Sequence, residues 1–367
     1  MDTPQPAATA DPTGDVDTAW RQIHDSKLDQ RDRQRVWANW LTFLSKQHEP
    51  IDRYLRNISQ TRRVDLLLAF AVAVRRGDYG RGRRVKAGTP EKALRFVCQT
   101  IELAGFPDPR RPHGGLTLAL PFRWLLQAWR DDDAPAKQQL ALPASAFFEL
   151  HSRQLALATP FAEAIGDLTL IAFYYLLRAG EYTRSARKTR TVQFRRRDVR
   201  LWRNGQLLPH DSPAEVLLQA DAATLYMDNQ KNSQRGSTLH HHTLQHNPTH
   251  CPVKALARRV IRLRSVTHDP NITISCFAPD QHVQPADITR SLRIIARDLG
   301  LYTAGYSPDR ISSHSLRASG AMALKLAGHD SITIKKMGRW SSDTFLMYIH
   351  SQIACLSAGL SANMALP

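Results

Sequence analysis

Tyr348 is the residue whose type and position most directly raise the question of chemistry. It lies near the C-terminal end, in the segment GRWSSDTFLMYIH at residues 338–350. A tyrosine hydroxyl has a pKa of about 10, so it is a poor nucleophile at neutral pH unless other groups assist it. Tyr348 lies at the edge of an apolar stripe with the helical period. Periodicity therefore allows either a nucleophile or an ordinary amphipathic tyrosine.

Groups that could assist a tyrosine occur at several points upstream. Arg178 lies at the end of the most apolar predicted helix, where a charge needs a partner, and Glu181 could supply it. His314 and Arg317 are three positions apart on a predicted helix, so they share a face. The first pair alone could serve structure only, and the second alone would be an ordinary surface pair.

Two further residues are ambiguous in the same way. Lys231 lies at the tip of a predicted hairpin with the sequence NQKNSQRG. Hairpin tips often carry lysine for solubility, so this position alone indicates little. Trp340, in the sequence GRW, would alone be interpreted as a core aromatic.

Taken in order, these residues resemble the tyrosine recombinase family, the phage integrase-like enzymes. The resemblance covers residues 146–355, and the helical segment before them is similar in type to the family's core-binding domain. GRWSSD is most similar to recombinases of eukaryotic or protist mobile elements, such as Crypton-like ones. The matching motifs are RAGE from Arg178, Lys231 in the hairpin, HSLR from His314 and GRWSSDTFLMY ending at Tyr348.

The resemblance implies a role for each of these side chains around a phosphodiester. Arg178 and Arg317 would bind the non-bridging oxygens, which gather negative charge during attack. Tyr348 would attack phosphorus and form a 3′-phosphotyrosyl link. Lys231 would protonate the leaving 5′ oxygen, and His314 would assist proton transfer.

Supporting roles follow from the same resemblance. Trp340 would donate its indole N–H to a phosphate oxygen, and Glu181 would orient Arg178 or His314. Many family members have histidine where this chain has Trp340. If Trp340 does not hold that position, Arg339 is the alternative residue.

The function implied by the resemblance is site-specific recombination of double-stranded DNA. Family members act as a homo-tetramer on two DNA sites through a Holliday junction, here for excision or integration of a mobile element. The covalent link stores the energy of the cut, so no cofactor, ATP or metal is expected. Two alternatives remain, a type IB topoisomerase-like strand relaxation and a non-catalytic DNA-binding regulator derived from a transposon. We also expect residues 354–367 to dock on a neighbouring subunit.

Composition favours a nucleic-acid partner independently of the motifs. Lys and Arg total 50 against 33 Asp and Glu, which gives a formal net charge of +17. Such an excess indicates a polyanionic partner. The sequence shows no signal peptide, and its longest apolar run, residues 168–177, is too short for a bilayer span. We therefore predict a nuclear or cytoplasmic protein that is neither secreted nor in a membrane.

Cysteine and histidine usage gives no sign of a disulfide framework or of a metal site. The cysteines lack CxxC spacing, so we expect reduced thiols. The histidines between residues 240 and 250 suggest zinc, but neighbouring side chains on a strand point to opposite faces. We therefore predict no metal. The residues concerned are Cys98, Cys251, Cys276 and Cys355, and His240, His241, His242, His246 and His250.

The elements that position these side chains predict a mainly α fold with a small antiparallel β-sheet. An N-terminal helical core-binding domain would precede a mixed α+β tyrosine recombinase catalytic domain. The boundaries expected are a disordered tail at 1–17, a helical DNA core-binding domain at 18–131, a linker at 132–145, and a catalytic domain with a C-terminal tail at 146–367.

Several elements of the catalytic domain are expected from local patterns. The apolar helix before Arg178 should end at that residue, with Gly180 as its C-cap. Strand-like alternation occurs in residues 191–202, 214–221 and 223–230, and the last of these begins the hairpin that carries Lys231.

A basic, glycine-rich loop at residues 75–88 lies between two helices of the N-terminal domain. We predict that it contacts DNA phosphates, although a solvated basic loop would have the same composition. The DNA-binding residues predicted there are Arg75, Arg76, Arg81, Arg83, Arg84 and Lys86.

Overall fold

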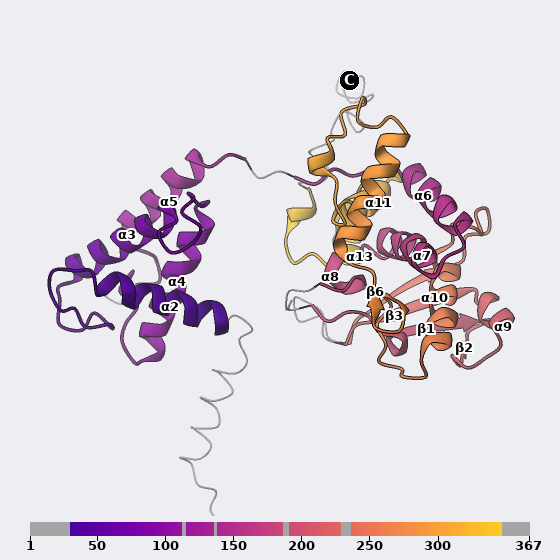
Figure 1. The fold of residues 1–367 in the computed structure, drawn as a ribbon, viewed down its shortest axis with the longest axis horizontal. Coiled ribbons are helices and arrows are strands. Elements are labelled where there is room, and N and C mark those ends of the chain that lie inside the picture. The colour runs from indigo at the N-terminus through magenta and orange to yellow at the C-terminus, as the bar shows by residue number, and fades with distance from the viewer. Residues whose placement is uncertain (1–29, 112–114, 136–137, 186–190, 229–235, 347–367) are drawn as a thin grey trace, which may run out of the picture. The chain divides into compact units, whose positions relative to one another are not determined.

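The chain forms two compact units, Met1–Ala136 and Lys137–Pro367, and each is described by itself. The division falls inside the segment 132–145 that the sequence predicts as a linker. The predicted tail at residues 1–17 lies outside the described part of the chain. The structure, a computed structural model, describes residues 30–111, 115–135, 138–185, 191–228 and 236–346 (Figure 1).

The first unit is helical. Its core gathers aromatic and branched side chains from four helices, with Trp40 and Phe70 in edge-to-face contact at 5.2 Å between ring centroids. Ser59 Oγ accepts the backbone N–H of Arg62 and so caps the second of these helices. The helices are α2 (Gln30–Leu44), α3 (Gln60–Arg76), α4 (Gly88–Leu103) and α5 (Leu120–Asp132).

A four-stranded antiparallel sheet, in the order β2-β1-β3-β4, lies in the second unit. The predicted hairpin is confirmed, because β3 and β4 pair with Leu225 opposite Leu239. The strands are β1 (Val199–Arg203), β2 (Gln206–Leu208), β3 (Ala222–Tyr226) and β4 (Thr238–His242), with a separate pair β5 (Cys276–Ala278) and β6 (Gln281–His282).

One predicted strand, residues 214–221, is wrong, and of the strand predicted at residues 191–202 only 199–202 belong to one, β1, because Arg196–Asp198 form a short 3-10 helix. Residues Ala214–Leu218 form a short helix, α9, which begins directly after Pro213 and buries Leu217 alone. The missed strand is β2, which follows β1 through a two-residue turn at Asn204 and Gly205, both with positive φ. Asn-Gly between two strands is a strong hairpin signal because both residues tolerate that conformation.

Helices pack on one face of the sheet of the second unit and bury its long apolar helix, α7, which packs against α6, α10 and α12 (Figure 1). These helices are α6 (Ala144–Ala156), α7 (Pro160–Tyr174), α8 (Ala179–Tyr182), α10 (Pro252–Val266), α11 (Pro285–Asp298), α12 (Ser315–Leu326) and α13 (Ser331–Gly338). The mainly α fold with a small antiparallel sheet is therefore confirmed. No helix in the described ranges is long and apolar enough to cross a membrane.

The end of α7 differs from the prediction. The helix stops at Tyr174, and Leu176 takes a left-handed conformation with φ 48°. Arg178 is then the N-cap of α8, and Gly180 lies inside α8 and is no C-cap of α7. The uniformly apolar sequence of this region hides the break, because its residue types alone would continue the helix.

Candidate active site

Glu181 lies against Arg178, the partner that the spacing suggests. The backbone N–H and Nη1 of Arg178 donate to the Glu181 carboxylate at 2.8 and 3.1 Å. Glu181 is 0 % exposed, whereas the Arg178 side chain is 17 % exposed. The carboxylate therefore fixes one edge of a guanidinium that solvent still reaches.

Arg339 is a second partner of Glu181. Its Nη1 and Nη2 donate to Oε1 and Oε2 of Glu181 at 3.0 and 2.7 Å, and its side chain is only 4 % exposed. A two-point pair of this kind fixes direction as well as distance. Arg339 also follows α13 in the left-handed conformation, with φ 56° and ψ 45°, which is costly for a residue other than glycine.

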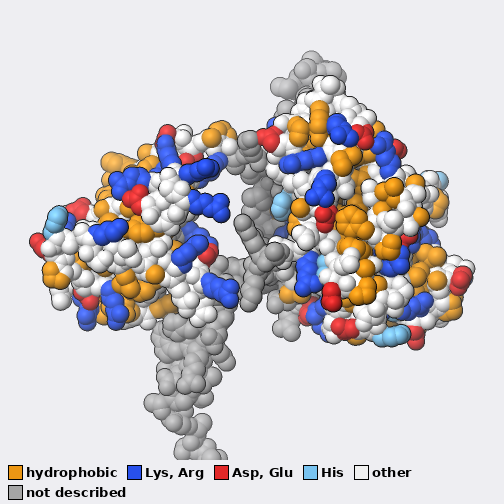
Figure 2. Space-filling model, in the orientation of Figure 1, with side chains coloured by type: hydrophobic (Ala, Val, Ile, Leu, Met, Phe, Trp, Pro, Cys, Tyr) orange, Lys and Arg blue, Asp and Glu red, His pale blue; other side chains and the backbone are white. Residues whose placement is uncertain are grey.

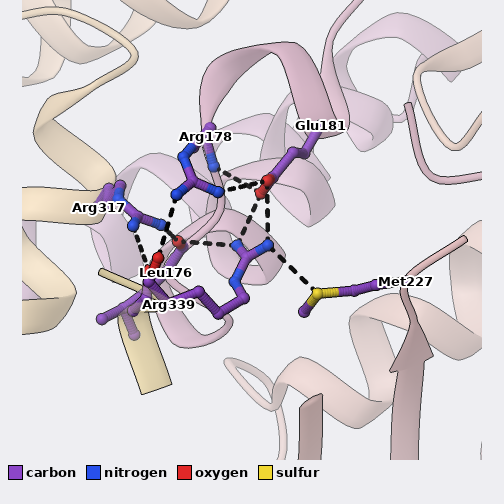
Figure 3. A network of polar contacts seen from close by, with 7 residues as sticks. Leu176, Arg178, Glu181, Met227, Arg317 and Arg339 are labelled. Carbon is purple, nitrogen blue, oxygen red and sulfur yellow. Dashed lines mark hydrogen bonds and ion pairs between the residues drawn. The ribbon is translucent and has the colours of Figure 1, made fainter. Parts of the chain in front are cut away.

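Arg317 joins the cluster from α12. Its buried guanidinium donates from Nη1 to Leu176 O and from Nη2 to Gly338 O. Arg339 Nη2 also donates to Leu176 O, at 3.4 Å, and Arg178 Nη2 donates to Arg339 O at 3.2 Å. Figure 3 shows the three guanidiniums converging on one small region.

Glycine at position 320 allows this arrangement. A β-carbon there would lie 2.5 Å from Phe173 O and 3.0 Å from Leu176 Cγ. Only glycine therefore lets α12 approach the end of α7 so closely. The same approach carries Arg317 to the Leu176 carbonyl, which the early end of α7 leaves outside that helix.

The cluster carries an excess of positive charge. Burial raises the pKa of Glu181, but the charge and hydrogen bonds of Arg339, with those of Arg178, outweigh burial and hold the pKa below its usual value. Glu181 is therefore ionised at neutral pH. Among the described residues of the cluster, three guanidiniums lie with one carboxylate, and this positive excess is an electrostatic setting that suits an anion.

Trp340 packs on Arg317. The Arg317 Cζ lies 4.1 Å from the centroid of the indole ring, and the Phe345 ring lies at 5.4 Å on a tilted plane. A β-carbon at Gly338 would overlap the indole, so that glycine also makes room for the ring. Trp340 thus supports a guanidinium through a cation–π contact. Its donation to a phosphate oxygen stays a prediction.

His314 precedes Arg317 by three positions and flanks the start of α12 as its N-cap residue. The side chain is exposed and makes no hydrogen bond to the described part of the protein. Shielding by neighbouring protein atoms and, to a smaller degree, the charge of Arg317 lower the pKa of His314. The structure therefore does not bring His314 into contact with Glu181.

Lys231 and Tyr348 both lie outside the described residues. The flanks of the Lys231 hairpin are described: Met227 pairs with Ser237 through a backbone hydrogen bond of 2.9 Å. Met227 Sδ also lies 3.6 Å from Arg339 Nη1, so the hairpin starts beside the arginine cluster. The roles of Lys231 and Tyr348 stay predictions.

Sequence reasoning underrated Arg339. It appeared only as the alternative to Trp340, yet the structure brings both side chains to the cluster. The available signal was a charged residue next to a glycine, in KKMGRWSS. That signal is weak, because an exposed arginine after a helix would have the same sequence.

The basic loop of the first unit folds back on Gly77, whose φ is 93°. A β-carbon at Gly77 would overlap the backbone of Arg83, so glycine is required there. Five of the six predicted DNA-binding residues are exposed, namely Arg76, Arg81, Arg83, Arg84 and Lys86. Lys and Arg side chains are prominent on the faces of both units that are seen in Figure 2.

Arg75 does not fit the prediction of a DNA contact. It is 5 % exposed, its Nη1 donates to Asp133 at 2.7 Å and to Val85 O at 2.8 Å, and its guanidinium lies over the Trp129 ring. These contacts tie α3 to the end of α5. We correct its role to a structural one.

The histidine-rich strand behaves as the strand geometry predicts. His241 points into the core against Tyr175, and burial lowers its pKa to about 4. His240 and His242 lie together on the other face, with ring centroids 4.7 Å apart. In the described ranges, no three His, Cys, Asp or Glu side chains form a group that could hold a metal ion. Cys98, Cys251 and Cys276 are buried free thiols.

Solved structures resemble this chain over most of its length. The XerH site-specific recombinase bound to palindromic difH, in a post-cleavage complex, matches 95 % of this chain and 84 % of its own, at 14 % identity and a TM-score of 0.54. XerH bound to difH before cleavage gives 94 % and 84 %, at 14 % identity and a TM-score of 0.51. The chain has the fold of the tyrosine recombinases.

No family model matches the chain, and no curated protein matches its sequence. The Tn1549 transposon integrase in complex with transposon right end DNA covers 93 % of this chain and 98 % of its own, at 13 % identity and a TM-score of 0.47. The arginine cluster of this recombinase fold is assembled from α8, α12 and the residue after α13.

Proposed function

We propose that this protein cuts and rejoins strands of double-stranded DNA as a site-specific tyrosine recombinase. One observation carries the proposal: Arg178 and Arg339 bind one ionised carboxylate, and Arg317 lies beside them on the Leu176 carbonyl that Arg339 also contacts, in a unit with the recombinase fold. A basic chain of this kind attracts DNA, and the phosphodiester of DNA is the anion that would reach such a cluster.

One guanidinium of the cluster faces the substrate, and the other two support that guanidinium or add positive charge. Arg178 is the most exposed of the three, so it is placed to bind a non-bridging phosphate oxygen in a planar, two-point manner. Arg339 is buried against Glu181 and orients the carboxylate that orients Arg178. Arg317, supported by Trp340, supplies further positive charge.

The chemical step transfers the phosphoryl group to tyrosine. The Tyr348 oxygen attacks phosphorus, a P–O bond forms to tyrosine, and the bond from phosphorus to the 5′ oxygen breaks. Lys231 gives its proton to the leaving 5′ oxygen. His314 accepts the phenolic proton, because its lowered pKa keeps the imidazole neutral at pH 7. In the reverse step a 5′ hydroxyl attacks the phosphotyrosine, so no external energy source is consumed.

The experiment that tests this proposal uses nicked duplexes carrying candidate element ends. Cleavage beside a nick releases a short fragment and traps the enzyme on DNA as an adduct that survives denaturant. The wild-type protein should form the adduct and the variant Tyr348→Phe should not. Absence of an adduct from every candidate DNA would contradict the enzymatic function and favour a non-catalytic regulator.

Recombination between two sites is the finer part of the proposal. The protein would act as a homo-tetramer on two DNA sites, through a Holliday junction, during excision or integration of a mobile element. Joint products from two labelled sites would support this. Relaxation of a supercoiled plasmid that lacks any target site, without joint products, would favour a type IB topoisomerase-like activity instead.

A further inference from the structure

A hollow of the second unit lies at the β2 edge of its sheet. It has a volume of about 530 Å³ and is bounded by the start of β1, the β2 strand with the segment after it, and the end of α10 with its following loop. That volume falls in the range of small-molecule sites, about 300 to 1,000 Å³.

Two arginines are built into the wall of this hollow without a carboxylate partner. Arg196 is 7 % exposed, and its Nη1 and Nη2 donate to Thr267 O and His268 O at 2.9 and 2.5 Å. Arg264 Nη1 donates to His210 O at 3.0 Å. Across the described chain, neither guanidinium has an acidic side chain within ion-pair distance. A buried cation bound only by carbonyls keeps its full charge, which is costly unless an anion compensates it.

The Nε atom of Arg196 is buried and has no hydrogen-bond partner in the described protein. Buried polar atoms are nearly always satisfied. The Nε atoms of other arginines, such as Arg75 and Arg339, are unsatisfied in the same way, so this atom supports a ligand only together with the four guanidiniums that line the hollow.

Two further arginines reach the same hollow from its more exposed side. Arg200 stacks on the Tyr226 ring at 5.0 Å, and Arg197 pairs loosely with Asp228 at 3.5 Å. A role confined to holding the surrounding loops explains the carbonyl contacts of Arg196 and Arg264. It does not explain why four guanidiniums line one hollow with Asp211 as its only acidic lining residue among those described.

Part of the remaining lining is apolar. Leu207, Leu208, Pro209 and Pro270 form a wall beside the arginines, and Leu207 is 53 % exposed although it is a large hydrophobic residue. A ligand that fits both parts carries phosphate groups for the arginines and a flat or apolar portion for the wall.

From these observations we infer that the hollow beside β1 and β2 binds a small phosphorylated molecule with an apolar or planar portion, of the class of a nucleoside polyphosphate. The site shares no residue with the arginine cluster around Glu181, and β2 and β4 are opposite edges of the sheet. The inference therefore does not depend on the proposed strand transfer. An inward hollow suits a compact ligand, whereas the DNA backbone would meet a more continuous basic surface.

The test measures binding to the full-length protein by titration calorimetry. The probes are ATP, inorganic triphosphate, adenosine and a short duplex DNA. We expect ATP to bind with a Kd of about 1 mM or lower, triphosphate to bind more weakly and adenosine not to bind measurably. Because the chain carries a net charge of +17 and attracts any polyanion, an arginine variant outside the hollow is the necessary control.

The variants are chosen at exposed positions so that folding is preserved. Arg200→Gln and Leu207→Glu should each weaken ATP binding about tenfold or more, whereas Arg203→Gln, on the same strand but outside the hollow, should leave it unchanged. The inference is overturned if ATP does not bind, or if triphosphate binds as tightly as ATP. It also fails if Arg203→Gln weakens ATP as much as Arg200→Gln, or if Arg200→Gln weakens duplex DNA as much as ATP.

Discussion

The two units each carry a group of arginines, and the groups differ in how the protein holds them. In the second unit, Arg317 and Arg339 are buried, and Arg339 is fixed by paired bonds to Glu181. In the first unit, Arg81 and Arg83 are exposed on a glycine-shaped loop and have no ion-pair partner in the described structure. Buried guanidiniums that several hydrogen bonds hold in place suit catalysis, which needs fixed geometry. Exposed guanidiniums suit attraction to a phosphate backbone.

The largest expected effect is a loss of stability when the carboxylate that holds the buried arginine group is removed. Replacing Glu181 with alanine leaves buried guanidiniums without their carboxylate, which should lower the free energy of unfolding by about 3 to 5 kcal/mol. Urea unfolding measures this. The exposed carboxylate Glu215 is the matched control, and Glu215→Ala should change stability by less than about 0.5 kcal/mol. Equal losses for both variants would contradict the view that Glu181 anchors the cluster.

The same carboxylate predicts a direction of pH dependence. Because the folded pKa of Glu181 lies below its usual value of 4.5, its contribution to stability is fully present above that pH and is lost as the pH falls through the folded pKa. The wild-type protein should therefore lose more unfolding free energy on acidification than Glu181→Gln. A parallel decline of both proteins would show that other carboxylates dominate acid unfolding.

The second effect separates geometry from charge. Arg178→Lys keeps a positive charge but loses the planar fork, so formation of the DNA adduct should slow by about 10² to 10³-fold. Duplex affinity should change by less than about threefold, because the charge is retained. Filter binding and single-turnover cleavage give the two numbers. Arg203→Lys, at an exposed site on β1, should change neither.

These two arginine groups also show where sequence reasoning reached its limit. The pairing of Arg178 with Glu181 was predictable, because three residues separate them and a charge beside an apolar helix needs a partner. The place of Arg339 was not, because it depends on a left-handed turn after α13 that returns its side chain to α8. The break at Leu176 was equally hidden inside a continuous apolar run.

The first unit teaches the same lesson from the opposite side. Arg75 and Arg83 belong to one basic stretch and are indistinguishable by composition, yet one is buried and the other exposed. What separates them is Asp133, a residue far along the chain that accepts from Arg75 Nη1. Local sequence patterns do not reveal a long-range pair of this kind. The Asn204-Gly205 turn between β1 and β2 of the second unit, in contrast, is a local signal and could have been recognised from the sequence.

A third prediction concerns close packing in the two units. Gly320→Ala forces a β-carbon against the end of α7, so it should lower stability by about 1 to 3 kcal/mol and reduce cleavage by displacing Arg317. Gly88, the first residue of α4, has no atom within 4 Å of an added β-carbon. Gly88→Ala should therefore be neutral or stabilising in thermal unfolding. A neutral Gly320→Ala would show that α12 can shift without consequence.

The smallest effect tests the exposed loop directly. If Arg83 contacts a phosphate, Arg83→Gln should lower duplex affinity modestly and reduce the slope of log Kd against log salt by about 0.9, while leaving stability unchanged. Arg75→Gln should instead lower stability and leave the salt slope unchanged, because it breaks a buried ion pair that joins α3 to the end of α5. Salt-dependent binding and urea unfolding of both variants distinguish the roles. An unchanged salt slope for Arg83→Gln would mean that this part of the loop is merely solvated.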